Sequence, residues 1–451
     1  MGDLMDLATS VVEQARPGEG MEVYVTRGSE TEVRAYQGEI ESLTSADSSG
    51  VGIRIVTGGT DGAQVGFSWA GSLEPSVIDD ALTEARDNAR YATFDPDVVL
   101  AQPDGVAAVS LDLWHDGVET TPMDRKVEMA LELERATTGT DPRVRRVRGA
   151  EYSDSRREVA LASTTGIRST ARRTNAYLSV EAIAEDGGDT QIDYAYSVGR
   201  SPDELSADDA SKDAIVRATR LLGAQKAKST RCTVVFDPRV VSTILAVVSS
   251  ALSGEAVVKQ RSFFAGRIGE PVANASVTLV DDPTDVRAFG ASSHDGEGLA
   301  CRRNVLISDG VLRMFVYDAL SARRARTSST GSAVRGGFAG TPSAGCRALV
   351  LTPGSRSAEE ILGQVGEGLF VQSVSGVHSG VNPVSGDFSV GAEGLMISGG
   401  ALAGPVREVT VASTLQRMLQ SVVEVGNDLT WLPGVAAGQT VAIADMSLGG
   451  D

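Results

Sequence analysis

The sequence predicts an α+β fold, with antiparallel β-meanders and packed helices in the N-terminal half and a larger, mixed, β-rich C-terminal domain. Short segments that alternate apolar and polar residues are typical of half-buried strands. Other segments carry apolar residues at every third or fourth position, the pattern of a helix that packs on a sheet. Glycine-containing turns connect many of the strands, which favours antiparallel neighbours. Short helices that alternate with such sheets define the α+β class.

Residues 1–92 are predicted to form a first domain of helix plus meander. An amphipathic helix over residues 1–16 precedes the strands, and short glycine-containing turns at 27–29, 37–38 and 57–59 connect them. Pro75 suits the first turn of a second helix, since no hydrogen-bond donor is needed there. The predicted strands are 22–27, 31–36, 50–56 and 63–68.

Residues 93–225 are predicted to form a second domain of the same kind, after a linker over 93–112 that contains two prolines. A helix over 123–136 comes first, and turns are expected at 156–157 and 165–166. Ser206 is a suitable N-cap for a closing helix over 205–222. The predicted strands are 144–153, 156–163, 167–184 and 190–199.

Residues 226–451 are predicted to form the third and largest domain. A strand at 233–236 precedes a helix that begins at Pro238 and ends near residue 253. Asp309-Gly310 is a typical hairpin turn between two short strands. Ser357 and Glu360 have the spacing of a capping box, and the helix that they open is expected to end at Gly366.

A glycine-rich stretch, residues 376–429, closes the third domain. It is predicted to contain strands at 388–390, 394–397 and 408–411. A helix is expected next, because apolar residues follow at helical spacing, and Gly426-Asn427-Asp428 is expected to end it. The apolar positions of this helix are Leu415, Met418, Leu419, Val422 and Val423.

Charge and composition exclude several classes of function. The net charge is −19, and the basic residues form only short clusters, such as 143–148 and Arg172-Arg173. Nucleic-acid binders need a basic stripe, so no nucleic-acid partner is expected. No run of eighteen apolar residues is present, so no membrane association is expected. The start of the chain has no basic region followed by an apolar core, which predicts a cytoplasmic location.

The stretch 376–429 resembles the C-terminal core of the TldD/TldE (PmbA) family, and within that family it is similar to the TldE side. Residues 38–43 and 50–54 resemble the first domain of the same family. The resemblance implies an assembly of two related chains. One is a TldD-like chain that holds zinc and cleaves unfolded or leader peptides, and the other is a TldE-like chain that completes the cavity for an extended peptide.

The residues at the family's zinc position differ in this sequence. In TldD-like chains a His-Glu-x-x-x-His segment holds zinc, and a cysteine follows the glycine-asparagine-aspartate stop. Here residues 245–250 read Leu-Ala-Val-Val-Ser-Ser, and no cysteine follows residue 428. None of these side chains binds zinc. The resemblance therefore implies no catalytic residue, metal or cofactor in this chain, and zinc in a TldD-like partner.

Three segments are candidates for facing a peptide or the partner subunit: residues 291–303, 327–331 and 378–389. Each has a plainer interpretation, namely a solvated glycine-rich turn, a simple turn, and a surface histidine beside a turn. The candidate residues are Ser293, His294, Asp295, Glu297, Arg302, Thr330, His378 and Asp387.

Two hypotheses on function remain open. The first is a non-catalytic, zinc-free TldE-like subunit of a heterodimeric metallopeptidase that cleaves unfolded or leader peptides, including those of natural-product pathways. The second is an independent amide hydrolase, or a peptide-binding homodimer, that does not use the family's zinc site. Residues around His378 or Asp295 would carry an independent activity.

Overall fold

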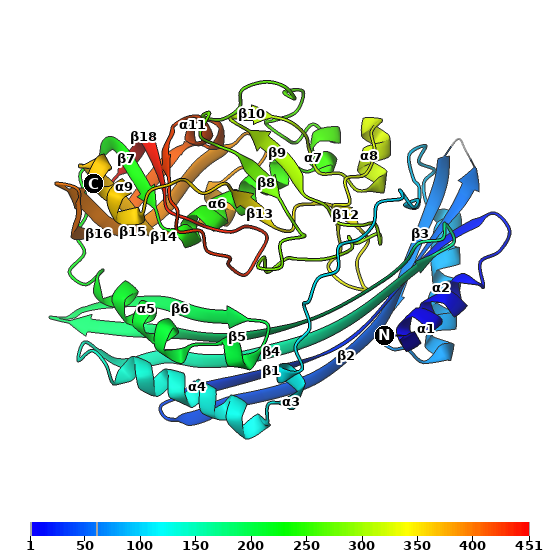
Figure 1. Ribbon diagram of the computed structural model, residues 1–451, viewed down its shortest axis with the longest axis horizontal. Helices are drawn as coiled ribbons and strands as arrows, with labels where there is room; N and C mark the ends of the chain where they lie inside the picture. The colour runs from blue at the N-terminus through cyan, green and yellow to red at the C-terminus, as the bar shows by residue number, and fades with distance from the viewer. Residues whose placement is uncertain (1, 60–61, 451) are drawn as a thin grey trace.

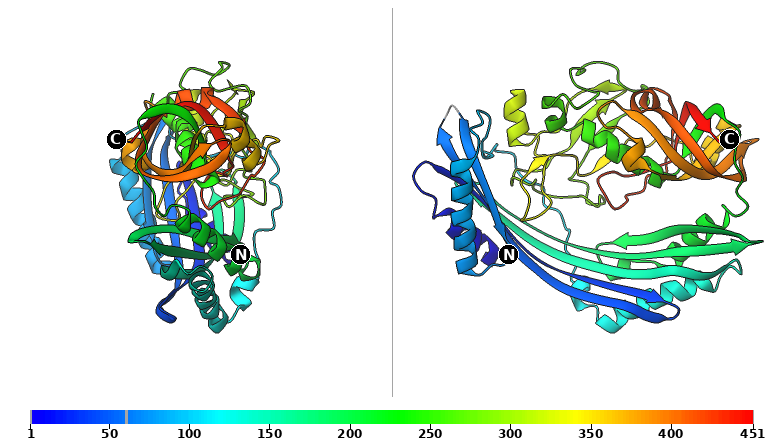
Figure 2. Two further views of the ribbon diagram at one scale, coloured as in Figure 1. Left: turned by 90° about the vertical axis from the view of Figure 1, so that its left-hand side faces the viewer. Right: turned by 180° about the vertical axis from the view of Figure 1, so that it is seen from behind.

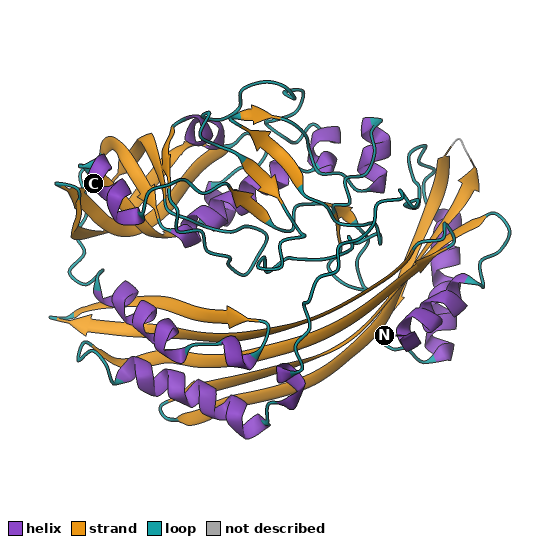
Figure 3. Cartoon of the chain, viewed as in Figure 1, coloured by secondary structure: helices purple, strands orange, loops and turns teal. Residues whose placement is uncertain are grey.

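A computed structural model describes residues 2–59 and 62–450 of the chain. The N-terminal half forms one long, curved, antiparallel sheet of six strands, and the C-terminal half lies over its concave face (Figures 1 and 2). The helices of the N-terminal half pack on the convex face, and loops make up much of the C-terminal surface that faces the sheet (Figure 3). The α+β class is confirmed.

The curved sheet has the strand order β3-β2-β1-β4-β5-β6. Pairing of β1 with β4, from Glu22 opposite Ser163 to Ala35 opposite Ala150, joins the first two predicted domains into one sheet. The strands are β1 (Glu19–Tyr36), β2 (Glu39–Gly59), β3 (Gly62–Ala70), β4 (Val144–Ser163), β5 (Arg168–Asp186) and β6 (Asp189–Gly199).

The turns predicted at 27–29 and 156–157 are wrong, because β1 and β4 run straight through both positions. Gly28 lies opposite Arg157 in the ladder, and a Cβ at Gly28 would be 2.5 Å from the Arg156 carbonyl oxygen. The glycine therefore serves a close approach of two strands rather than a turn.

Two groups of helices bury the convex face of the sheet. At one end α1 (Gly2–Val12) and α2 (Pro75–Tyr91) cover the apolar residues of β1 and β2, such as Val23 and Ile53. At the other end α4 (Met123–Thr138) and α5 (Ala207–Thr219) share a core with β1, β4, β5 and β6. Ser206 caps α5 by accepting from the Asp209 N–H, as predicted. Short α3 (Gly117–Thr120) and the 3-10 turn η1 (Pro202–Glu204) complete this half.

A second six-stranded sheet, of order β16-β15-β14-β7-β18-β17, forms the C-terminal core. A further pairing of β16 with β18 closes the sheet on itself, and only β7 and β14 run parallel. Helix α6 (Pro238–Ala251) and helix α11 (Leu415–Gln420) contribute side chains to its core. The strands are β7 (Thr230–Phe236), β14 (Gly368–Ser375), β15 (Asp387–Ser398), β16 (Ala401–Thr414), β17 (Val422–Val425) and β18 (Val441–Gly449).

Smaller elements surround this core. A four-stranded sheet has the order β10-β9-β8-β13, and β11 pairs with β12. The turn at Asp309-Gly310, which connects β9 to β10, has positive φ at both residues, as the predicted hairpin requires. The remaining elements are α7 (Gly254–Val258), β8 (Leu279–Asp281), β9 (Asn304–Ser308), β10 (Val311–Leu312), α8 (Ala319–Ala325), β11 (Ala333–Val334), β12 (Ser343–Ala344), β13 (Leu349–Leu351), α9 (Ala358–Val365) and α10 (Val377–Gly380).

The last predicted helix is too long, because α11 ends at Gln420 and Val422–Val425 forms β17 against β18. Val422 and Val425 are buried and Val423 is exposed. The apolar spacing of this segment fits a helix and a short strand about equally, and pairing with β18 decides for the strand. The predicted capping box of Ser357 and Glu360 is confirmed, and Gly366 ends α9 with positive φ. Within residues 2–59 and 62–450, no helix has the length and apolar character needed to cross a bilayer.

Phe338, in the loop between β11 and β12, packs on strand β2 of the curved sheet. A Cβ at Gly52 would lie 2.2 Å from the Phe338 carbonyl oxygen, and one at Gly50 would lie 2.6 Å from its ring. The Trp69 ring stands 5.7 Å from the Phe338 ring, measured between centroids. The two glycines thus leave the space in which the C-terminal half contacts the sheet.

We expect Gly52→Ala to lower the free energy of unfolding by about 1–3 kcal/mol, because the added methyl group forces the Phe338 loop away from β2. Urea denaturation checks this change. Gly404→Ala is the matched control, since a Cβ there meets no atom within 4 Å. Equal stability of the two variants would contradict a tight contact at Gly52.

Candidate functional site

A cavity of about 380 Å³ lies between the concave face of the curved sheet and the C-terminal half. We call it the interdomain cavity. Its floor comes from β1, β4 and β5, and its roof comes from the loop after β8 and from residues on either side of β12. The floor includes Tyr24, Arg157, Val159, Leu161, Ser169 and Arg173, and the roof includes Ser292, Ser293, His294, Asp295, Gly296, Arg335 and Arg347.

Asp295 organises the roof. Its Oδ1 accepts hydrogen bonds from the N–H groups of Glu297 and Leu299, at 2.9 and 3.0 Å. Its Oδ2 accepts from the Ala333 N–H at 3.0 Å, which connects the loop to β11. The side chain is buried, and burial raises its pKa, although these three donors act in the opposite direction. All three bonds are to backbone, so the carboxylate shapes the loop.

A buried ion network joins the roof to the floor. Glu22 of β1 accepts from Arg54 of β2 at 2.8 Å and also pairs with Arg335 of the roof. Burial alone would raise the pKa of Glu22, but Arg54 and Arg335 lower it overall. The Arg335 guanidinium also lies 4.8 Å from the centre of the Tyr24 ring. These contacts connect the two halves of the molecule at the cavity.

Glu297 is the fourth member of this network. Its Oε1 is 3.5 Å from the Arg54 Nη2, and its Oε2 accepts from the Ala319 N–H at the start of α8, at 2.8 Å. Burial raises the pKa of Glu297 to about 8, and Arg54 opposes that shift only in part. The plainer interpretation of this loop, a solvated glycine-rich turn, does not hold for Glu297, because its side chain is buried and contacts the start of α8.

A group of arginines dominates the rest of the cavity wall. Arg157 and Arg173 lie directly opposite each other in the β4–β5 ladder. Burial, together with the neighbouring guanidinium groups of Arg200, Arg347 and Arg157, lowers the pKa of Arg173 to about 10. The Arg173 side chain donates to the Ala291 carbonyl and the Arg347 side chain to the Ala333 carbonyl. The cavity is thus a basic site in an acidic chain.

The eight residues predicted from the sequence fall into separate places. Ser293, His294 and Asp295 line the interdomain cavity, and Glu297 lies in the network behind it. Burial lowers the pKa of His294. The other four do not line the cavity, and they are Arg302, Thr330, His378 and Asp387.

Arg302 forms an ion pair with Asp104 of the linker. The Thr330 hydroxyl accepts from the Tyr317 N–H at 2.7 Å, so it supports the chain before α8. His378, in α10, and Asp387, at the start of β15, are both exposed. Asp387 accepts from the Ser385 hydroxyl at 2.6 Å.

Sequence reasoning missed the arginines of the floor and the roof. Arg173 was visible only as part of a short basic cluster. The signal that could have found the pair is strand alternation, which places Arg157 on the same face as Val159 and Leu161. The assignment of a turn at 156–157 removed that signal, because it broke β4 at this point.

Helix α6 holds residues 245–250, the segment at which the resemblance places the family's zinc motif. Leu245 and Val248 are buried in the C-terminal core, beside Met418 and Leu419 of α11. Ser250 is exposed, and its hydroxyl donates to the Val247 carbonyl. In the described part of the chain, no three His, Cys, Asp or Glu side chains are placed to hold a metal ion. The residues of α6 therefore do not fit a zinc site.

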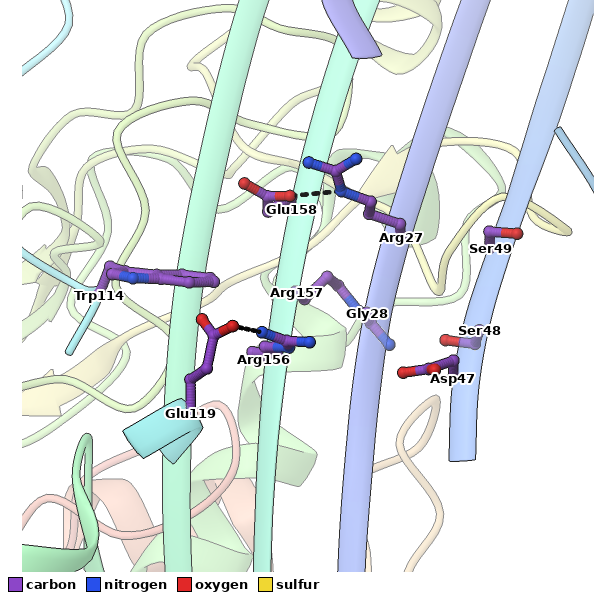
Figure 4. A pocket seen from close by; sticks show the side chains of 10 residues that line it. All are labelled: Arg27, Gly28, Asp47, Ser48, Ser49, Trp114, Glu119, Arg156, Arg157 and Glu158. Carbon is purple, nitrogen blue, oxygen red and sulfur yellow. Dashed lines mark hydrogen bonds and ion pairs between the residues drawn. The ribbon is translucent and has the colours of Figure 1, made fainter. Parts of the chain in front are cut away.

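A second cavity, of about 470 Å³, lies between α3 and the strands β1, β2 and β4 (Figure 4). Four of its charged side chains form two ion pairs. Arg27 contacts Glu158 at 2.6 Å, and Arg156 contacts Glu119 of α3 at 2.9 Å. Charge compensation of this kind leaves no net attraction for a small ion, so the interdomain cavity is the better candidate site.

Comparison with protein families now defines the class: the chain is built from the three domains of a metallopeptidase. Models of the PmbA/TldA metallopeptidase match residues 21–89 (domain 1), 116–222 (central domain) and 229–450 (C-terminal domain). The chain belongs to the PmbA/TldD metallopeptidase family.

The alignments with two individual relatives cover nearly the whole chain. Metalloprotease PmbA of Escherichia coli O157:H7 is 27% identical, with 98% of this chain and 95% of that protein covered. A PmbA homologue of Haemophilus influenzae is 26% identical, with 100% and 96% covered. The crystal structure of TldE from Thermococcus kodakarensis has a TM-score of 0.87 and covers 100% of both chains at 23% identity, which shows that the fold is shared.

Glu297→Gln tests the buried network through pH. A carboxyl group whose pKa is raised in the folded state contributes stability that is complete below its ordinary pKa of 4.5 and is lost as the pH rises through about 8. We expect the wild-type free energy of unfolding to fall by roughly 2 kcal/mol more than that of the variant between pH 6 and 8.5. Urea denaturation at both pH values measures this difference.

Glu359→Gln serves as the control for this comparison, because Glu359 is exposed on α9. It should follow the wild-type pH dependence. A Glu297→Gln variant with the wild-type slope would show that Glu297 is already ionised at pH 6 in the folded protein.

Proposed function

We propose that this chain is a zinc-free, TldE-like subunit of a heterodimeric metallopeptidase of the TldD/TldE type, and that it is not catalytic by itself. The TldD-like partner would supply the zinc and cut the peptide bond. Unfolded or leader peptides, including those of natural-product pathways, are the proposed substrates. We propose the cytoplasm as the location, with no nucleic-acid or membrane partner.

One observation carries this proposal: a chain of a metallopeptidase family has Leu245, Ala246 and Ser250 where zinc ligands and a general base are needed. Leu245 is buried in the core of the C-terminal sheet, and Ser250 bonds to its own helix. A thiolate, imidazole or carboxylate is required to bind zinc, and a positioned base is required to activate its water. The similarity to the TldE fold is consistent with this division of labour.

Two features of the structure support an extended peptide as the substrate. The interdomain cavity has polar groups from both halves of the molecule on its wall. In addition, β3 pairs with β2 only over residues 51–59, so residues 39–50 of β2 have no second partner strand in the described part of the chain. A free strand edge can pair with the main chain of a peptide.

The free edge of β2 also favours the second candidate, a peptide-binding homodimer. An independent amide hydrolase has less support. Three backbone N–H groups already occupy most of the lone-pair sites of Asp295, and His378 and Asp387 are exposed on other elements. A general base needs a free lone pair within reach of the reacting proton.

We expect the purified chain to contain well below one zinc per chain and to leave an unfolded, fluorescently labelled peptide uncut. A mixture with a TldD-like chain should cut it, because only that chain carries the His-Glu-x-x-x-His segment. Metal analysis and digestion of each chain alone and of the mixture measure this. Co-purification of the two chains at equal amounts is the structural readout.

The matched control is the same mixture with the motif glutamate of the TldD-like chain changed to glutamine. It should assemble but lose cleavage. Full activity of the TldD-like chain alone, or stoichiometric zinc bound by this chain alone, would reject the proposal. Cleavage by this chain alone that is lost in Asp295→Ala or His378→Ala would favour the hydrolase.

A further inference from the structure

We propose that the arginines of the interdomain cavity form a subsite for a carboxylate group of the bound peptide, with Arg157, Arg173 and Arg347 as its ligands. The inference deepens the proposed function, because it rests on an extended peptide as the substrate. It assigns to this zinc-free chain a direct role in recognising that peptide.

The first observation is the position of Arg157 and Arg173. They face each other across the β4–β5 ladder, with Ala171 opposite Val159 and Ser169 opposite Leu161 farther along the same face. Like charges in directly opposed positions destabilise a sheet. A bound anion between the two guanidinium groups would remove that repulsion. The Arg173 side chain donates to the Ala291 carbonyl, a structural contact that does not involve Arg157.

The second observation is the lack of acidic partners. Among residues 2–59 and 62–450, no carboxylate forms an ion pair with Arg157, Arg173 or Arg347. Arg157 has no side-chain hydrogen bond in that part of the chain, and the Arg347 Nε is buried with no acceptor. By contrast, buried Arg54 and Arg217 each contact carboxylates.

The third observation is that the carboxylates near the cavity are held by other groups. Asp295 lies in the roof, but its two oxygens accept three backbone N–H bonds. Glu22 and Glu297 are held by Arg54 and by Arg335 or Ala319. The whole chain carries a net charge of −19, so three arginines without an acidic partner around one cavity are unusual for this chain.

The chemistry of the arginines indicates the ligand. A guanidinium group presents a planar fork of N–H donors that matches the two oxygens of a carboxylate. In an extended peptide that carboxylate is either the C-terminal group or an aspartate or glutamate side chain. Ser293 and His294 line the same cavity and would contact the main chain on either side of it.

Isothermal titration calorimetry of the isolated chain tests the subsite without any partner or zinc. The probes are acetyl-Ala-Ala-Ala-Ala with a free C-terminus, the same peptide as its amide, and acetyl-Ala-Asp-Ala-Ala-amide. Binding of the first peptide identifies a C-terminal carboxylate, and binding of the third identifies an acidic side chain. The neutral amide should bind at least about 10-fold more weakly than the preferred acid.

Arg157→Gln should weaken binding of the preferred peptide by about 10- to 100-fold, as expected for the loss of a charged hydrogen-bond donor. The same variant should raise the melting temperature of the free protein, because it relieves the repulsion with Arg173. Arg173→Gln is the second variant for the same test. Arg313→Gln is the control, since Arg313 is exposed and far from the cavity lining.

Equal affinities for the acidic peptides and the amide would overturn the subsite, as would no measurable binding of any peptide. If inorganic phosphate binds more tightly than either acidic peptide, the proposed carboxylate ligand is wrong and the site binds another anion. These results are independent of heterodimer formation. If the peptides do not bind as expected but the mixture of the two chains cleaves its substrate, the subsite is rejected and the proposed function stands. If the carboxylate peptide binds but the mixture is inactive, the subsite stands and the proposed function is rejected.

Discussion

The buried network of Glu22, Arg54, Arg335 and Glu297 is the interaction on which the arrangement of the two halves depends. Two carboxylates and two guanidinium groups meet where the curved sheet contacts the C-terminal loops. Removal of one partner from a buried ion pair leaves an uncompensated charge, which typically lowers the free energy of unfolding by about 3–5 kcal/mol. The pairs that cross from sheet to roof, Glu22 with Arg335 and Arg54 with Glu297, form only in one relative position of sheet and roof, and they make that position specific.

The position of the roof determines what the cavity contains. Asp295 connects its loop to β11 through the Ala333 N–H, and Glu297 connects the same loop to the start of α8. Both acidic side chains are engaged in these contacts, and most of the other charged side chains on the cavity wall are arginines. Phe338 adds an apolar contact on Gly50 and Gly52, at a different place on the same sheet. Charge and shape complementarity act together in holding the two halves.

Local signals in the sequence predicted most of the elements but not the length of the strands. The caps at Ser206 and Ser357 and the hairpin at Asp309-Gly310 depend on neighbouring residues only, and all were predictable. The twenty-residue β4 was not, because Arg156-Arg157 looks like a turn until the partner strands on both sides are known. Pairing of β1 with β4 joins residues more than one hundred positions apart, and no local pattern contains it.

The same dependence on residues far apart in the sequence explains why the candidate site was predicted only in part. Residues 293–297 were singled out as a segment, but their burial follows from Arg54 and Ala333, which lie far away in the sequence. His378 and Asp387 were singled out because they lie in a glycine-rich stretch. Both are exposed, on elements that do not line the interdomain cavity. Arg157 and Arg173 form a site only through strand register, a property of the folded sheet.

The unpaired arginines and the buried network are best understood together. Like charges at the floor of the cavity oppose folding, whereas the ion pairs of the network beside them favour it. The chain can therefore retain the repulsion without losing the arrangement of roof and floor. Natural proteins keep such locally unfavourable groups mainly at sites of function, where a ligand completes them. Helix α6 shows the opposite case: Leu245 and Val248, in the segment at which the resemblance places the zinc motif, are packed in the core and leave no polar group for a ligand to complete. By this criterion we propose the interdomain cavity, rather than α6, as the place where this chain contributes to recognition.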